Sequence, residues 1–192
     1  MPRSTRWLPA GRSATRLRSG CRGAGNERPD QVSSHLVHSI QALVLAGDPE
    51  QRAALAVAGA RVVPVGGGLL LVPITSPLLT YVESQHSGRY DGPSRTCRAL
   101  TGALARFARR LSSTGPVAYI ETDYFGGHGD QAATVFLRGQ RVLRRPRATI
   151  GPINAALALL GATSSALGDA FDTVGLGRYR QTGLWLAEAI EP

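Results

Sequence analysis

The apolar residues fall into short runs from residue 35 onward, and polar or glycine-rich segments separate these runs. The first run ends at Gly47 and is short enough for a buried strand. Two β-rich runs at 61–65 and 69–74 follow, and three glycines lie between them, which is the spacing of a hairpin. The beginning of this region therefore predicts one strand followed by a hairpin.

Helical signals interrupt the strands. Asp48 and Pro49 are typical of a helix start, because Asp48 can cap free amides and Pro49 lacks an N–H that the first helical position does not need. Gly59 marks the end of that helix. A second helix is predicted to begin at Ser94 or Thr96, because apolar residues then recur at helical spacing.

The centre of the chain predicts a β-meander, with strands at 117–124, 131–137 and 141–143 joined by short turns. A helix at 152–160 follows, the segment 76–83 fits a helix or a strand equally well, and the form of 162–192 is open. Strands and helices mix without a βαβ alternation. We therefore expect an α+β fold, in which helices pack on one face of a mostly antiparallel sheet.

Residues 1–34 differ from the rest, because arginine alternates there with serine, glycine and proline and large apolar residues are few. We expect a disordered arginine-rich extension, followed by a single α+β domain over 35–192. Two other interpretations of the extension are a start codon assigned too early, which we favour, and an organellar transit peptide. Prolines and glycines would break the amphipathic helix of a transit peptide.

The charge of the chain lies partly in this extension. The 192 residues carry a formal net charge of +9, and all 22 of the basic residues are arginine. Seven arginines against two acids leave +5 in residues 1–34, and 15 against 11 leave +4 in the remainder. The absence of lysine excludes P-loop, Schiff-base and lysine general-base chemistry.

Cysteine usage and hydropathy indicate a cytoplasmic protein with no membrane span. Cys21 and Cys97 form no CxxC pair, so reduced thiols are expected. Proline and polar residues interrupt the longest apolar run, at 69–82. Cys97 beside His86 or His128 is a candidate nucleophile if a helix N-terminus lowers its pKa, although a packed cysteine is the simpler interpretation.

The segment 119–133 concentrates acids, a histidine and three glycines at the end of a strand. Its candidate binding residues are Tyr124, Phe125, Gly126, Gly127, His128 and Asp130. A phosphate cradle is disfavoured by the acids, and a metal site formed by Asp123, His128 and Asp130 lacks a known ligand spacing. The glycines otherwise provide the positive φ of a wide hairpin with His128 at its tip. We expect no bound metal and no cofactor.

Two further features are weaker. Arginines at 138, 141, 144, 145 and 147 could contact phosphates, or they could protect an edge strand from aggregation. They lack interleaved aromatic residues, so we expect no nucleic-acid binding beyond weak nonspecific contact. His35 and His38, on the first strand, decorate its exposed side or satisfy a core hydrogen bond.

Several motifs resemble those of a group of small uncharacterised bacterial proteins. They are the YFGGxGxQAA hairpin at 124–133, the INAAL segment at 153–157 and an FDxVGLG segment at 171–177. The resemblance covers about 35–182. It implies no activity and no catalytic residues, and some proteins of this style are immunity or accessory proteins.

We therefore expect a non-enzymatic module that binds a protein partner, of the immunity or accessory type, through the loop at 125–130. The alternative is a small metal-dependent hydrolase centred on Glu121, Asp123, His128 and Asp130. These two functions differ in whether the loop holds a divalent cation.

Overall fold

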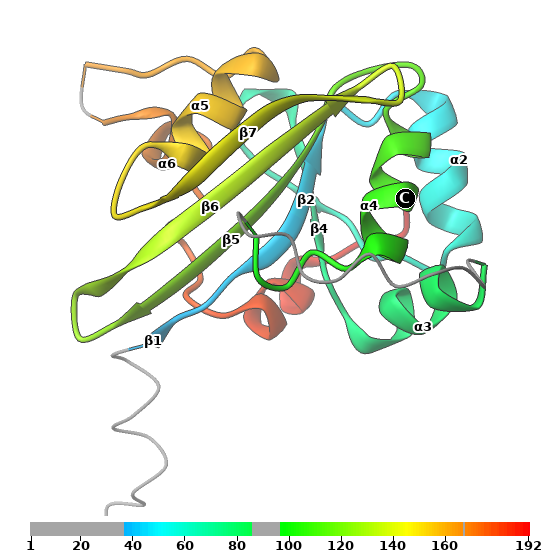
Figure 1. Cartoon of the computed structure of the whole chain (residues 1–192), viewed down its shortest axis with the longest axis horizontal. Coiled ribbons are helices and arrows are strands. Elements are labelled where there is room, and N and C mark those ends of the chain that lie inside the picture. Colours follow the sequence, from blue (N-terminus) through cyan, green and yellow to red (C-terminus); the bar gives the residue numbers. More distant parts are fainter. Residues whose placement is uncertain (1–36, 86–96, 167) are drawn as a thin grey trace, which may run out of the picture.

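The computed structural model describes residues 37–85, 97–166 and 168–192, which are organised around a seven-stranded sheet (Figure 1). Its strands are β1 (Val37–His38), β2 (Gln41–Leu45), β3 (Val63–Pro64), β4 (Leu70–Pro73), β5 (Val117–Phe125), β6 (His128–Leu137) and β7 (Gln140–Ala148). Their order is β3-β4-β2-β5-β6-β7, with β1 paired to β5 beyond the end of β2. These ladders are antiparallel, and β5, β6 and β7 form the predicted meander.

Helices cover this sheet on two sides (Figure 1). The helices are α2 (Pro49–Val57), α3 (Ser76–Ser84), α4 (Gly102–Leu111), α5 (Pro152–Leu159), α6 (Ala170–Thr173) and the 3₁₀ segments η1 (Gly66–Gly68) and η2 (Thr182–Glu188). The segment 76–83 is thus a helix. None of the helices in the described ranges is long and apolar enough to cross a membrane.

The α+β class and the mostly antiparallel sheet are confirmed, but the expectation of helices on one face is wrong. Tyr119 of β5 packs into a core with α2, α3 and α4. Its neighbour Ile120 belongs to a second core, with α5, α6 and the buried Trp185 of η2. Successive side chains of a strand point to opposite faces of the sheet. A strand whose consecutive residues are all apolar therefore needs helices or other cover on both faces.

The first predicted helix is confirmed in detail. The Asp48 carboxylate accepts a hydrogen bond from the Gln51 amide at 2.9 Å, and the Gln51 side chain accepts one from the Asp48 amide at 3.3 Å. This reciprocal pair is a capping box. Pro49 occupies the first turn, and Gly59, with φ of 60°, follows the helix end.

The second predicted helix begins later than expected. Thr101 caps α4, because its hydroxyl accepts a hydrogen bond from the Leu104 amide at 3.2 Å. Cys97 therefore precedes the helix and cannot lie at its N-terminus. Ser94 and Thr96, the expected caps, lie outside the described residues, as does the extension over 1–34.

The β5–β6 hairpin turns through two residues, which is tighter than the wide turn expected. Phe125 pairs with His128, and Gly126 and Gly127 between them have φ of 57° and 82°. Positive φ at both central residues is typical of a type I′ turn. Gly129 makes a different contribution, because a Cβ there would lie 2.0 Å from the Asp123 carbonyl oxygen.

We predict that Gly129→Ala destabilises the protein more than Gly127→Ala. Alanine at 127 incurs only the cost of a left-handed backbone, about 1–2 kcal/mol, because no heavy atom lies within 4 Å of its Cβ. Alanine at 129 must also displace the backbone of β5. Thermal midpoints of both variants measure the difference, and about 1 kcal/mol corresponds to roughly 2–4 °C in a chain of this size. Equal midpoints would contradict the proposed close approach.

Candidate functional site

A recess of about 340 Å³ opens on the face of the sheet that carries α5 and α6. Four separate parts of the chain build its walls, and their side chains combine aromatic, amide and charged groups. The lining residues are His38, Thr122, Tyr124, Gly127, Gln131, Ile150, Asn154, Asp169, Phe171 and Arg180. A concave, largely apolar wall with a few placed polar groups is typical of a ligand site.

Gln131 of β6 organises the base of the recess. Its Oε1 accepts a hydrogen bond from the Ile153 amide at 2.9 Å, which ties β6 to the start of α5. Its Nε2 donates to the Tyr124 hydroxyl at 3.2 Å and to the Thr149 carbonyl at 3.3 Å. The Tyr124 hydroxyl donates to the same carbonyl. The Tyr124 ring is therefore fixed by a buried amide.

Asn154 of α5 fixes the opposite wall. Its Oδ1 accepts a hydrogen bond from the Phe171 amide at 2.8 Å, and its Nδ2 donates to the Asp169 carboxylate. The other Asp169 oxygen caps α6 by accepting from the Asp172 amide at 3.0 Å. One short network thus sets both the start of α6 and the position of the Phe171 ring.

His38 lies between the two aromatic rings. Its ring centroid is 6.0 Å from that of Tyr124, in an edge arrangement, and 6.2 Å from that of Phe171. Its Nδ1 is 2.9 Å from the Thr122 hydroxyl. Burial, and then the positive charge of Arg180, lower the pKa of His38 below its ordinary value of 6.5. The recess therefore contains a neutral imidazole at neutral pH.

The opposite face of the same two strands carries an ion network. Glu121 of β5 is only 3% exposed and accepts hydrogen bonds from the Arg98 and Ala99 amides at 2.7 and 3.0 Å. The Tyr119 hydroxyl donates to it at 3.0 Å. Arg147 of β7 pairs with Glu121 and also with Asp130 of β6. One guanidinium therefore bridges two carboxylates.

This pairing bears on the metal-dependent alternative. Burial alone would lower the pKa of Arg147, but the hydrogen bond to Asp130 and the attraction of Glu121 raise it on balance. Asp123 pairs with Arg98 at 3.5 Å, and His128 is exposed at the hairpin end with its Nδ1 3.2 Å from the Gly126 carbonyl. Within the described ranges, His, Cys, Asp and Glu side chains form no group of three that could hold a metal ion.

The six candidate binding residues divide between the two faces. Tyr124 and Gly127 line the recess, whereas Asp130 belongs to the ion network. Phe125, which is 62% exposed, follows Asp123 by two residues and so lies on the ion-network side of the hairpin. The expected loop surface is therefore not a single patch.

Cys97 lies beside the ion network. It is fully buried, and burial followed by the nearby Glu121 charge raises the pKa of its thiol to about 12. A thiol in this state is protonated at neutral pH and is a poor nucleophile. Of its expected partners, His128 is at the distant hairpin end and His86 lies outside the described residues. Cys97 is packing material here.

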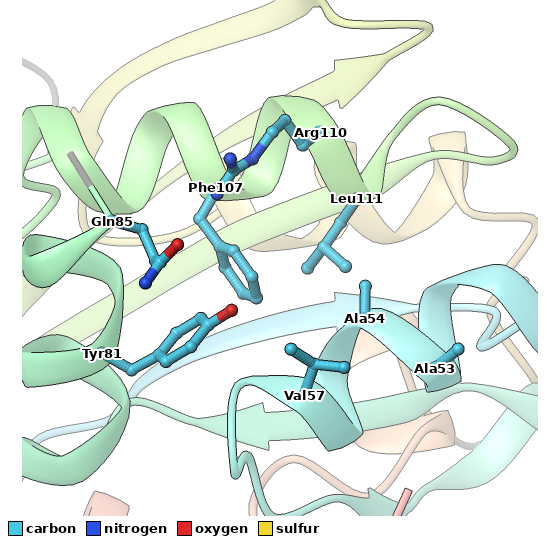
Figure 2. A pocket seen from close by; sticks show the side chains of 8 residues that line it. All are labelled: Ala53, Ala54, Val57, Tyr81, Gln85, Phe107, Arg110 and Leu111. Carbon is cyan, nitrogen blue, oxygen red and sulfur yellow. The ribbon is translucent and has the colours of Figure 1, made fainter.

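An apolar groove of about 400 Å³ lies between α2, α3 and α4 (Figure 2). Figure 2 shows Tyr81 of α3, Phe107 and Leu111 of α4 and Val57 of α2 pointing into the groove. Val57 is 73% exposed. The polar groups around the groove are the Tyr81 hydroxyl, Gln85 and Arg110. We regard the recess as the better candidate, because its polar groups are positioned by a network.

Most recess residues were missed as site residues by sequence reasoning, although a signal for them existed. Gln131, Asn154 and Phe171 each lie in one of the three motif segments that carry the resemblance. The structure brings these segments together around one cavity. Asp169, Ile150 and Arg180 lie just outside the motifs.

No protein-family model matches the chain, and no curated protein or solved structure matches it either. The geometry described above is therefore the basis for the function proposed below.

We predict that His38 makes folding stability depend on pH. The pKa of His38 is lower in the folded state, so the unfolded chain binds more protons between the two pKa values, and stability falls as pH drops through about 6.5. His38→Asn, which can keep a contact with Thr122, should lose this component. Urea unfolding between pH 7.5 and 5 measures it, with the exposed His128→Asn as control. An unchanged pH profile in His38→Asn would contradict the lowered pKa.

We also predict that Arg147→Met destabilises the fold by about 3–5 kcal/mol, because it leaves the buried Glu121 without a counter-charge. The matched control is Arg98→Met, which breaks an exposed pair with Asp123, on the same strand as Glu121, and should cost less than about 1 kcal/mol. Adding Glu121→Gln to Arg147→Met should restore part of the loss. Equal, small decreases in the free energy of unfolding of both arginine variants would show that the ion network contributes little to stability. Denaturant unfolding measures all four proteins.

Proposed function

We propose that the protein is a non-enzymatic cytoplasmic binding module and that the recess between β5, β6, α5 and α6 holds a segment of a protein partner. The observation that carries this proposal is the convergence of Tyr124, Asn154 and Phe171 on one cavity of about 340 Å³. Such a volume is within the range of natural ligand pockets.

The hydrogen bonding favours binding over catalysis. The amides of Gln131 and Asn154 are engaged on both their nitrogen and oxygen atoms with neighbouring protein groups. This rigidity lowers the entropic cost of binding, because the walls are already in place. Thr122, although near His38, is a buried hydroxyl that accepts the Ile40 amide at 2.9 Å, so it acts as a structural partner and not as a free nucleophile.

The chemistry of the walls favours an aromatic or aliphatic side chain as the group that enters. The rings of His38, Tyr124 and Phe171 offer flat apolar contact, and Asp169 and Arg180 offer polar contact at the margin. Ile150 at the rim is 74% exposed. A largely exposed apolar residue at the rim adds contact area for a polypeptide, whereas a ligand small enough to be enclosed would leave most of it uncovered.

Peptide selection tests this proposal. A phage-displayed peptide library is panned on the whole chain, and selected peptides are titrated by fluorescence anisotropy. We expect peptides with an aromatic or large aliphatic anchor. Phe171→Ala should weaken their binding by about tenfold or more, because truncation of a central anchor contact typically costs over 1 kcal/mol.

Phe125→Ala is the matched control, since it removes the same side chain from the opposite face of the hairpin and should leave binding unchanged. A thermal midpoint for each variant establishes that it is folded. A larger loss with Phe125→Ala than with Phe171→Ala would move the binding surface to the hairpin end. Failure to select any peptide that depends on Phe171 would overturn the recess as a protein-binding site.

A further inference from the structure

Three arginines gather where α4 meets the edge strand β7. Arg109 lies in the last turn of α4, and Arg141 and Arg144 lie on β7 opposite Phe136 and Thr134 of β6. Phe136 belongs to the core under α4, and Thr134 pairs with Tyr119 of the same core. The arginine cluster, defined as Arg109, Arg141 and Arg144, is therefore on the face opposite the recess.

Phe136 brings two of these guanidinium groups together. The Cζ atoms of Arg141 and Arg109 lie 5.3 and 5.8 Å from the centre of its ring, which is fully buried. Both are within the range of a cation–π contact. The ring therefore holds two positive charges close to each other, at a position that the open edge of β7 leaves accessible.

The charges of this cluster repel one another. Burial, then Arg144, then Arg109 lower the pKa of Arg141. The acids of this face are already paired, since Glu121 and Asp130 contact Arg147 and Asp123 contacts Arg98. Among the described residues, no ion pair joins a carboxylate to Arg109, Arg141 or Arg144.

One donor of the cluster is also left without a partner. Nε of Arg141 is buried from solvent and makes no hydrogen bond within the described part of the chain. A buried donor without an acceptor is costly, and an oxyanion supplies several acceptors and a negative charge together. Arg147 differs in its charge balance, because two carboxylates pair with its terminal nitrogens although its Nε also lacks a partner among the described residues.

We propose that the cluster of Arg109, Arg141 and Arg144 binds an oxyanion of the phosphate type. A planar guanidinium matches two oxygens of a phosphate group, and three such groups from two elements can surround one anion. The ligand is a small phosphate, either inorganic or carried on a nucleotide. This site lies across the sheet from the recess and does not depend on the function proposed for it.

Calorimetric titration of the whole chain with inorganic phosphate, pyrophosphate and ATP, at constant ionic strength, tests the site. We expect binding that Arg141→Gln and Arg144→Gln each weaken by about tenfold, the size expected for a lost charged hydrogen bond. Arg110→Gln is the matched control, because it removes an equal, exposed charge from the same helix. It should bind as the unaltered chain does. Thermal midpoints show which variants are folded. If Arg141→Gln does not fold, Arg144→Gln alone tests the proposal.

The two ligand sources give different supporting results. Equal affinity for pyrophosphate and ATP identifies a free oxyanion as the ligand, whereas tighter binding of ATP identifies a nucleotide. Absence of binding by all three probes overturns the proposal. Equal weakening by Arg110→Gln and Arg141→Gln also overturns it, because the binding would then follow net charge alone. Binding of duplex DNA that pyrophosphate does not displace also overturns the proposal, because it would indicate an extended nucleic-acid surface.

Discussion

The burial of β5 on both faces is the constraint on which the rest of the structure depends. This strand pairs with β1, β2 and β6, and its residues from Val117 to Thr122 are all buried. Alternate side chains therefore enter different cores, Tyr119 under α4 and Ile120 under α5. The polar residues that follow keep this alternation. Glu121 faces the ion network and Thr122 faces the recess, so one strand contributes side chains to the network and to the recess.

Features set by neighbours in sequence could be predicted, and features set by distant pairing could not. Asp48 and Pro49 specify their helix because the cap bonds close within three residues. The observed start of α4 at Thr101 follows the same local rule, because the Thr101 hydroxyl accepts the Leu104 amide three residues later. The expectation of one covered face is wrong because consecutive apolar residues, such as Leu43 and Val44, enter different cores on the two faces of the sheet.

The candidate site was predictable only in part for the same reason. The hairpin glycines and the acids at 121–130 predict a single site because they are close in sequence. Strand alternation nevertheless places Tyr124 and Asp130 on opposite faces of the sheet. Asn154 joins the recess by accepting a hydrogen bond from the Phe171 amide and donating one to Asp169, over separations that no local pattern encodes. Arg147 similarly reaches Glu121 across β6, so two of the apparent metal ligands, Glu121 and Asp130, are ion-paired to one arginine instead.

Strand register consequently determines which side chains face the recess and which face the ion network. Gln131 and Asp130 are adjacent on β6, and one is the base of the recess while the other pairs with Arg147. A slip of one residue would exchange their faces, placing a carboxylate beneath the Tyr124 ring and an amide beside Arg147. The two-glycine turn and the close approach at Gly129 oppose such a slip, because both require particular residues opposite each other. The glycines of this hairpin therefore act on the recess and on the ion network through strand register.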